Sequence, residues 1–435
     1  MSSRLKNITG TFDILPAGAS REGVHAQGAA EWRYIEHRIR SIFERFQFEE
    51  IRTPILEPTE LIARGIGQLT DIVSKEMFAF EREDTQYVLR PELTAPVMRA
   101  YLQHRMDQLG GAQKLFYIGP CFRAERPQKG RYRQFHQFGA EVIGVEAPMA
   151  DAETIAVMMA IYHDFGVTNQ RLRINSLGDA ASRPRYRDAL RAYFEPFKAD
   201  LTETSLARLD KNPMRILDTK NEKERRLLDG APRLVDFIDS ESQEHYEAVK
   251  AYLADAGVAY IEDPFLVRGL DYYTRTAFEL ESDELGAQSA LAGGGRYDLL
   301  AREIGEEVGV PAVGFAAGIE RLFLAIEALG HAFPERSHPD VALVALGEAA
   351  GRWAFIQALA LRASGLAVSV DLQGRSMKAQ MRDANRSGAR YVVIVGDTEL
   401  AQRAAPVKHM ATGNQESVAI DALAPYLTSH APQGA

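Results

Sequence analysis

A strand–loop–strand pattern over residues 117–141 constrains the fold of this chain more than any other segment. Two runs of strand-forming residues flank a loop that contains Pro127 and Gly130, as in an antiparallel hairpin. Successive side chains alternate between the two faces of a strand. One face of the return strand therefore carries a cation, an aromatic ring, an amide, a gap and a carboxylate: Arg133, Phe135, Gln137, Gly139 and Glu141. Because a core face would not tolerate this set, the pattern predicts a substrate-binding face on an antiparallel sheet.

The loop of this hairpin is strongly basic. Four cations fall close together in it: Arg126, Lys129, Arg131 and Arg133. Such a density of cations suits a polyphosphate or a nucleic-acid backbone. A solvated hairpin tip would have a similar composition, so the loop alone leaves both interpretations open. The polar strand face beside it favours the functional one.

The rest of the first 330 residues combines helices with further strands. Apolar residues at helical spacing predict a long helix over 19–48, and two prolines predict an extended segment over 51–58. Short runs joined by turns predict an antiparallel sheet. These runs are 86–90, 115–123, 133–145, 172–175 and 277–281. Between about 176 and 260 the pattern becomes helical and highly charged, which predicts a helical insertion into the sheet.

A second domain is predicted at the C-terminal end. A chain of 435 residues is too long for one ordinary core. Prolines punctuate a linker over 331–339, and residues 340–435 alternate strands and helices. This alternation is typical of parallel βαβ units. We therefore expect a large α+β domain over 1–330 and a small α/β domain over 340–435.

One predicted helix of the second domain carries a basic stripe. Its cations are spaced by three and four residues, which places them on one helix face: Arg375, Lys378, Arg382 and Arg386. Asp383 interrupts the stripe in the sequence and is predicted to point elsewhere. In a chain of net charge −9 such a stripe favours a surface that follows phosphates. A solubilising outer face would look the same without that context.

Composition excludes several classes of protein. The single cysteine, Cys121, excludes an internal disulfide and fits a reducing compartment. The ten histidines are scattered, so we expect no metal held by the protein itself. No segment has the apolar length of a membrane span, and the first residues lack the apolar core of a signal peptide. We expect a cytoplasmic protein without membrane association.

Several ordered motifs resemble those of the histidyl-tRNA synthetases, a family of class II aminoacyl-tRNA synthetases. Residues 122–125, with the basic loop and Phe135, resemble motif 2. Residues 314–321 resemble motif 3, and Pro54 stands where motif 1 has its proline. Further matches are found at 10–13, 89–95, 266–273 and 293–298. The resemblance covers nearly the whole chain. It implies an α/β fold class: an α+β catalytic core on the class II antiparallel sheet flanked by helices, a helical insertion, and a C-terminal βαβ anticodon-binding domain.

The resemblance also implies an activity. A histidine–tRNA ligase joins histidine to ATP, with Mg²⁺ bound to the ATP, and releases pyrophosphate. It then transfers histidine from the adenylate to the 3′ end of tRNA(His), usually as a homodimer. The main alternative is a histidine-sensing regulatory paralogue of ATP phosphoribosyltransferase, which would be expected to lose the catalytic arginines and the C-terminal domain. An ATP-dependent amino-acid ligase with another acceptor is a further alternative, and the basic stripe counts against it.

By resemblance, Arg123 and Arg268 are the catalytic pair that holds the α-phosphate from two sides. Cations fixed where negative charge develops lower the barrier most. The ATP-binding residues would be Arg123, Glu125, Arg131, Phe135 and Arg321. Glu125 would receive the adenine amino group, while Phe135 and Arg321 would enclose the base by stacking and cation–π attraction.

The histidine-binding residues implied by the resemblance form a polar pocket. They are Glu92, Thr94, Gln137, Glu141, Tyr272, Tyr273 and Tyr297. Glu141 and Tyr273 would meet the imidazole, and Glu92, Thr94 and Gln137 the ammonium group. For each tyrosine a place in the buried core is an open alternative. Leu93 stands where many relatives have glycine, which predicts a slightly different backbone position at Glu92 and Thr94. In the C-terminal domain the basic stripe would contact the tRNA.

Overall fold

The computed structural model describes residues 5–16, 28–67, 70, 72–219, 221–268, 270, 272–283, 285, 289–330, 333 and 338–430. The chain divides into two compact units, residues 1–333 and 334–435, which we call the larger and the smaller unit. Within the described residues no helix has the length and apolar character needed to cross a bilayer.

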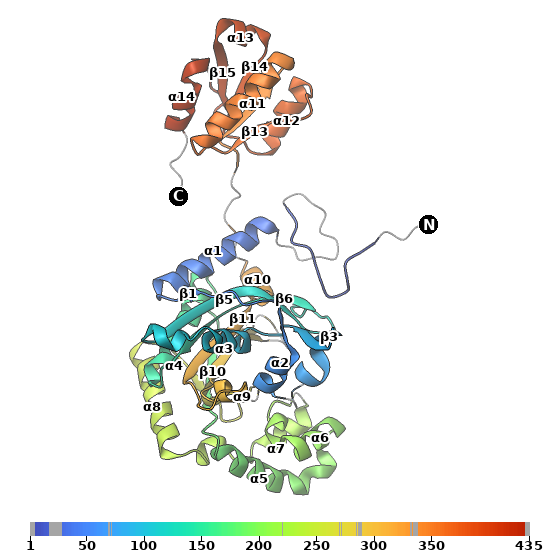
Figure 1. Cartoon of the computed structure of the whole chain (residues 1–435), viewed down its shortest axis with the longest axis vertical. Coiled ribbons are helices and arrows are strands. Elements are labelled where there is room, and N and C mark those ends of the chain that lie inside the picture. The colour runs from blue at the N-terminus through green and yellow to red at the C-terminus, as the bar shows by residue number, and fades with distance from the viewer. Residues whose placement is uncertain are drawn as a thin grey trace. The chain divides into compact units, whose positions relative to one another are not determined.

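The larger unit is built on an eight-stranded sheet in the order β1-β5-β6-β11-β10-β9-β7-β8 (Figure 1). The strands are β1 (Glu49–Glu50), β5 (Gln113–Phe122), β6 (Gln134–Ile143), β11 (Ala312–Gly318), β10 (Ala290–Arg296), β9 (Thr274–Glu281), β7 (Arg171–Ser176) and β8 (Ile261–Glu262). Every pairing from β5 to β7 is antiparallel, and only the edge strands β1 and β8 pair in parallel. The predicted antiparallel sheet is therefore confirmed, but its central strands β10 and β11 were not predicted, and the run predicted over 86–90 belongs to a separate sheet.

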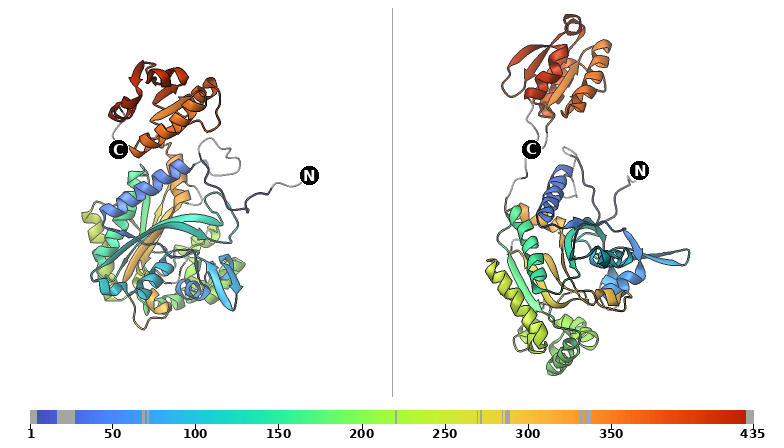
Figure 2. Two further views of the ribbon diagram at one scale, coloured as in Figure 1. Left: turned by 45° about the horizontal axis from the view of Figure 1, so that its top comes forward. Right: turned by 60° about the vertical axis from the view of Figure 1, so that its left-hand side comes forward.

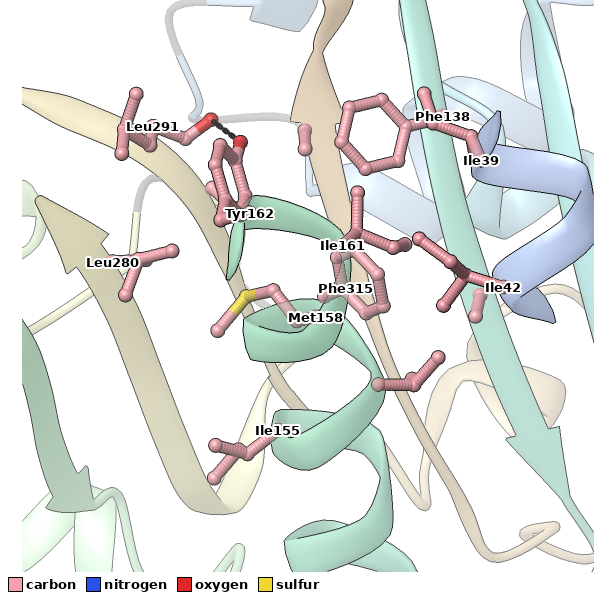
Figure 3. Packing of buried hydrophobic residues seen from close by; sticks show 14 of the residues in the cluster. Ile39, Ile42, Phe138, Ile155, Met158, Ile161, Tyr162, Leu280, Leu291 and Phe315 are labelled. Carbon is pink, nitrogen blue, oxygen red and sulfur yellow. Dashed lines mark hydrogen bonds between the residues drawn. The ribbon is translucent and has the colours of Figure 1, made fainter. Parts of the chain in front are cut away.

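Helices cover one face of this sheet and form the main apolar core. They are α1 (Ala29–Arg45), α4 (Pro148–Asp164), α8 (Ser240–Asp255) and α10 (Ile319–Ala328). Figure 3 shows side chains of α4 with the strand residues Leu280 and Leu291 on one side and with Phe138, Ile39 and Ile42 on the other. Within the described residues α1 is shorter than the helix predicted over 19–48, and residues 19–27 of that prediction lie outside the description. Residues 46–48 of the predicted helix follow its last helical residue, Arg45.

The helical segment after β7 divides into two parts. Its first part lies as a separate group of helices in Figures 1 and 2. This group contains α5 (Ser182–Phe194), η3 (Glu195–Asp200), α6 (Glu203–Lys211), η4 (Pro213–Ile216), α7 (Glu222–Leu228) and η5 (Leu234–Asp236), where η denotes a short 3-10 or π helix. The last helix, α8, instead returns to the sheet, because its Tyr246, Val249 and Leu253 belong to the main core beside α4.

The opposite face of the sheet carries a second apolar cluster, which borders the candidate site. Its residues come from β5, α3 (Thr94–Gln103), α5 and the segment before β9. A small antiparallel sheet adjoins it, formed by β2 (Leu56–Pro58), β4 (Thr85–Leu89) and β3 (Phe78–Arg82). The remaining short elements are α2 (Thr59–Ile66), η1 (Ile72–Glu76), η2 (Met106–Leu109) and α9 (Leu300–Glu303).

The smaller unit is a five-stranded sheet in the order β13-β12-β14-β15-β16. Its strands are β12 (Val341–Ala345), β13 (Val368–Val370), β14 (Tyr391–Val395), β15 (Ala404–His409) and β16 (Gln415–Ala419). Its helices are α11 (Glu348–Ala363), α12 (Met377–Arg386), α13 (Asp397–Gln402), η7 (Ile420–Ala422) and α14 (Leu423–His430). The strand β12 pairs in parallel with β13 and β14, which confirms the predicted βαβ arrangement. The last two strands extend the sheet antiparallel.

Candidate active site

A fully buried carboxylate, Glu141, lies at the centre of the candidate site. It stands on β6 and is 0% exposed. Its Oε1 accepts hydrogen bonds from the Thr94 hydroxyl at 2.8 Å and the Tyr117 hydroxyl at 3.0 Å, and its Oε2 accepts one from the Tyr297 hydroxyl. Burial raises the pKa of this carboxyl to about 8, although the three hydroxyl donors lower it. The site therefore holds an acceptor that titrates close to neutral pH.

Glycines on neighbouring strands make room for this cluster. Gly314 on β11 pairs with Glu141, and a Cβ atom there would overlap the carboxylate. Gly139 on β6 pairs with Tyr117 of β5, whose phenol occupies the space that a side chain would need. Glycine in a strand interior often marks such a close approach. The gap predicted at Gly139 is therefore filled by Tyr117, which the sequence interpretation missed.

Glu92 and Thr94 join the cluster through the start of α3. The Glu92 carboxylate accepts hydrogen bonds from the backbone N–H groups of Thr94 at 2.7 Å and Ala95 at 2.9 Å. Acceptors at this position stabilise a helix N-terminus. Burial raises the pKa of Glu92. Leu93 between them has φ −118°, a conformation open to any residue, so its side chain in place of glycine strains nothing.

The three predicted tyrosines are buried next to Glu141. The rings of Tyr272 and Tyr273 lie 4.7 Å apart, and those of Tyr272 and Tyr297 lie 5.6 Å apart. All three belong to the second apolar cluster. Gln137, on the same face of β6 as Glu141, accepts a hydrogen bond from the Cys121 thiol at 3.3 Å. The predicted histidine-binding residues thus share one side of the sheet.

Arg123, the first of the two predicted catalytic arginines, lies near Pro91 and Phe135. Arg123 donates from Nε to the carbonyl of Pro91 at 3.1 Å, and its guanidinium lies 5.2 Å from the centre of the Phe135 ring. Its charge also opposes the rise in the pKa of Glu92.

Arg268 borders the pocket through the tyrosines. Its guanidinium pairs with Glu279 at 2.5 Å and lies 5.7 Å from the centre of the Tyr273 ring. A Cβ atom at Gly293 of β10 would overlap this guanidinium. The glycine-rich strand therefore provides the surface against which Arg268 lies.

The remaining ATP-binding candidates gather around the basic loop. Arg131 pairs with Glu125 at 3.0 Å. Arg321 of α10 donates to the carbonyl of Ala290 at 2.5 Å, and burial together with the charge of Arg131 lowers its pKa. An added Cβ atom at Gly130 would come within 3.9 Å of Arg321, so the loop tip lies close to α10. In this state the Glu125 carboxylate is occupied by Arg131. No group of three or more His, Cys, Asp or Glu side chains within the described ranges could hold a metal ion.

The basic stripe of the smaller unit contains ion pairs that the sequence interpretation excluded. Asp383 does not point elsewhere: it pairs with Arg375 and with Arg386, each at 2.7 Å. The spacing explains this, because residues three apart on a helix are neighbours and Arg375 precedes the first turn of α12. Lys378 and Arg382 are exposed and form no ion pair with any residue the structure describes. They are the cations of the stripe that an external anion would meet first.

Comparison with known proteins identifies the relatives of this chain. Residues 22–322 match the family model of histidyl-tRNA synthetase, and residues 340–430 match that of an anticodon binding domain. The chain is 49% identical to the histidine–tRNA ligase of Chloroherpeton thalassium over 95% of both chains. Among solved structures, apo histidyl-tRNA synthetase of S. aureus is 40% identical, with a TM-score of 0.81 over 98% of this chain and 100% of that one.

An ATP phosphoribosyltransferase regulatory subunit/histidyl-tRNA synthetase from Bacillus halodurans has a TM-score of 0.60 over 90% of this chain and 98% of that one. At 23% identity this likeness shows the fold alone. A largely antiparallel sheet with this site, followed by an anticodon-binding domain, defines a class II aminoacyl-tRNA synthetase. Within that class, the chain belongs to the histidyl-tRNA synthetase family.

Proposed function

We propose that this histidine–tRNA ligase recognises histidine at Glu141 and activates it between Arg123 and Arg268. The observation that carries the proposal is the buried carboxylate of Glu141, held by three hydroxyl groups beside the tyrosine cluster. An imidazole ring offers one hydrogen-bond donor and one acceptor. In this proposal Glu141 accepts from the ring N–H, and Tyr273 completes the recognition.

The ammonium group of histidine requires acceptors near the start of α3. Glu92, Thr94 and Gln137 supply carboxylate, hydroxyl and amide oxygens in this proposal. Both oxygens of Glu92 already accept a backbone N–H, and each retains a further lone pair. An amino acid without ring nitrogens would leave the buried polar groups unpaired. Sites of this kind discriminate by roughly 10⁴–10⁵.

Activation joins two anions, so fixed positive charge is the main contribution that the protein can make. A carboxylate oxygen of histidine forms a bond to the α-phosphorus of ATP. The bond from that phosphorus to the bridging oxygen breaks, and pyrophosphate leaves with the electron pair. Arg123 and Arg268, both fixed beforehand by contacts with the protein, neutralise the charge that develops on the α-phosphate.

The pair between Arg131 and Glu125 would separate when ATP binds. In this proposal Arg131 turns to the outer phosphates, while Glu125 accepts from the adenine amino group. Phe135 and Arg321 then enclose the base. Mg²⁺ enters bound to the ATP phosphates, as part of the substrate.

Transfer completes the reaction. A hydroxyl of the terminal ribose of tRNA(His) attacks the carbonyl carbon of the adenylate, loses its proton and releases AMP. We propose that the smaller unit holds the anticodon stem-loop, with Lys378 and Arg382 on its phosphates and Arg375 and Arg386 beside them. The family resemblance further supports a cytoplasmic homodimer, which remains part of the proposal.

Histidine-dependent exchange of labelled pyrophosphate into ATP tests the proposed function. The purified protein is expected to exchange label only when histidine is present, because the polar pocket requires the imidazole. Phenylalanine and glutamine serve as matched alternative substrates, each tested in place of histidine. Phenylalanine has a ring without polar atoms, and glutamine has polar atoms without a ring. Equal exchange with either would contradict the assignment of the pocket.

A further inference from the structure

A buried carboxylate, Glu320, joins α10 to the start of β6. Glu320 lies in the first turn of α10 and is 2% exposed. Its two oxygens, Oε1 and Oε2, accept the backbone N–H of His136 at 2.9 Å and 3.1 Å. The Nδ1 atom of the His136 ring also lies 3.0 Å from Oε1. Both oxygens of this side chain are therefore directed at a single residue of β6.

The end of β11 explains why β6 needs this acceptor. The pairing of β11 with β6 ends at Gly318 and Gln137. His136 lies one residue beyond this pair, so β11 no longer offers an acceptor to its backbone N–H. An N–H group that is shielded from water and has no acceptor is unfavourable, and the Glu320 carboxylate supplies one. The side chain thus continues the hydrogen bonding of the sheet across the turn from β11 into α10.

The two ends of this bridge adjoin the residues that are proposed to enclose the adenine base. Phe135 precedes His136 on β6. Arg321 follows Glu320 on α10. The His136 ring lies 4.8 Å from the Trp32 ring of the main core, and successive strand residues face opposite sides, so Phe135 faces away from that core. The bridge therefore fixes the backbone of β6 next to Phe135 relative to the backbone of α10 next to Arg321.

The helix dipole alone does not account for this arrangement. An acidic residue in the first turn of a helix is favourable, and it can remain in water, where it keeps its hydration. Glu320 is instead buried against β6. A buried carboxylate is unfavourable unless its hydrogen bonds are well formed. The direction of both oxygens towards one residue favours a role in fixing the distance between α10 and β6.

We propose that Glu320 is a positioning residue for ATP. Its bridge to His136 sets the separation of Phe135 and Arg321, between which the adenine base is held. This inference rests on the proposed function and adds to it a residue outside the contacts with substrate. Stacking and cation–π attraction depend closely on distance, and a misplacement of about 1 Å can cost about 10²-fold. The substitution of Glu320 should therefore affect binding of the base more than binding of the phosphates or of histidine.

Three substitutions of Glu320 test position against charge. Glu320→Gln keeps the length of the side chain and an acceptor oxygen for the His136 N–H, so the KM for ATP should rise by no more than about threefold. Glu320→Asp keeps the charge but is one methylene shorter, and Glu320→Ala removes the acceptor. Both should raise the KM for ATP about tenfold, with the KM for histidine within about twofold of wild type.

The shorter acid also keeps the test decisive if Glu320→Ala does not fold. A KM for ATP that is normal in Glu320→Asp but raised about tenfold in Glu320→Gln would show that the charge matters and the position does not. That result would overturn the inference.

Glu224→Ala is the matched control for a loss of stability. Glu224 is also a buried carboxylate, in the helical group after β7. It accepts the backbone N–H of Thr202 at 2.7 Å and the hydroxyl of Ser205 at 2.9 Å. Its substitution should lower the melting temperature but leave the KM for ATP within about twofold of wild type. An equal rise in the KM for ATP in Glu224→Ala and Glu320→Ala would mean that Glu320 acts through stability alone, and the inference would be wrong.

Inhibition by the parts of ATP gives a readout that a loss of stability would not change. Adenosine carries the base, and tripolyphosphate carries the phosphates. In Glu320→Asp the inhibition constant of adenosine should rise about tenfold, in parallel with the KM for ATP, while that of tripolyphosphate stays within about twofold of wild type. A rise of the same size for both inhibitors would assign Glu320 to the whole ATP site rather than to the base, and would contradict the inference.

Arg321→Ala separates failure of the inference from failure of the proposed function. The proposed enclosure of the base requires this substitution to raise both the KM for ATP and the inhibition constant of adenosine. If it does so while Glu320→Asp and Glu320→Ala keep the wild-type constants, the inference is wrong and the proposed function stands. If Arg321→Ala leaves both constants unchanged, the proposed enclosure of the base is itself wrong, and the inference fails with it.

Discussion

At the scale of single residues, the protonation of Glu141 controls what the pocket can accept. The carboxyl is fully buried and its pKa is raised to about 8, chiefly by desolvation. Below that pH it holds a proton, and above it the carboxylate is a strong acceptor for an imidazole N–H. Tyr117 helps to hold the charged form, because its hydroxyl donates to Oε1 at 3.0 Å.

Tyr117→Phe is expected to weaken histidine binding selectively. One hydrogen bond to a charged group contributes about 1.5–3 kcal/mol, so the KM for histidine should rise about tenfold or more. The KM for ATP should stay near wild type. Tyr162→Phe is the control, since its hydroxyl donates to the carbonyl of Leu291 at 3.1 Å in the main core (Figure 3). An equal effect of both substitutions on histidine KM would show that Tyr117 acts only through stability.

The same carboxyl predicts a pH dependence with a defined sign. Histidine KM, measured by exchange, should fall as pH rises through about 8, because the charged acceptor then predominates. In the wild type the hydrogen bond from Tyr117 lowers the pKa of Glu141. Without this bond in Tyr117→Phe, the midpoint should move to higher pH. The folded state binds this proton more tightly than the unfolded chain, so the contribution of Glu141 to folding stability falls as pH rises towards that midpoint. A histidine KM with no inflection near this pH would contradict the assignment.

At the scale of elements, the glycine-rich strands explain both the site and the main error of prediction. Gly293, Gly294 and Gly295 on β10 and Gly314 on β11 lower the strand propensity of their segments, so neither was predicted. In the structure each of these glycines leaves space for a neighbouring side chain or backbone. The hairpin of β5 and β6 was predictable because its alternating pattern is strong. The strands β10 and β11, which complete the pocket, could not be predicted. Their glycines make room for neighbouring groups and so replace the β-branched and aromatic residues that are typical of strands.

Gly293→Ala is expected to reduce pyrophosphate exchange by displacing the Arg268 guanidinium. The new Cβ atom would overlap the guanidinium, which must then move from its place against β10. Removal of a fixed charge from a transition state typically costs about 10²–10³ in rate, so exchange should fall by that order. Gly351→Ala on α11 is the control, because nothing lies within 4 Å of its Cβ position and alanine favours the helix by up to about 1 kcal/mol. Exchange near wild type in Gly293→Ala would mean that Arg268 tolerates displacement.

The basic helix α12 shows a second limit of sequence reasoning. Arg375 precedes α12, and Asp383, which was predicted to point elsewhere, pairs with Arg375 and Arg386. Periodicity predicts on which face of a helix a residue lies. It does not predict whether a charged side chain on that face contacts solvent or forms an ion pair. The exposed residues Lys378 and Arg382 are therefore the cations of the stripe that are available to an external anion.

At the scale of the whole molecule, each unit has a core of its own. The larger unit contains the eight-stranded sheet and the residues around Glu141, and the smaller unit has apolar clusters on both faces of its sheet. None of these clusters, as far as the described residues extend, combines residues of both units. Such an arrangement allows binding of tRNA and chemistry to be supported separately.

Removal of residues 340–435 should therefore separate the two steps of the reaction. Every residue proposed for histidine and ATP lies before that point, so histidine-dependent exchange should stay within about twofold of wild type. Charging should fall by about a hundredfold or more in kcat/KM for tRNA, which corresponds to roughly 2.7 kcal/mol of lost binding. Lys378→Ala with Arg382→Ala in the full chain should reproduce part of this loss without truncation. Equal losses of exchange and charging on truncation would mean that the smaller unit supports the pocket itself, and the division of tasks between the units would be wrong.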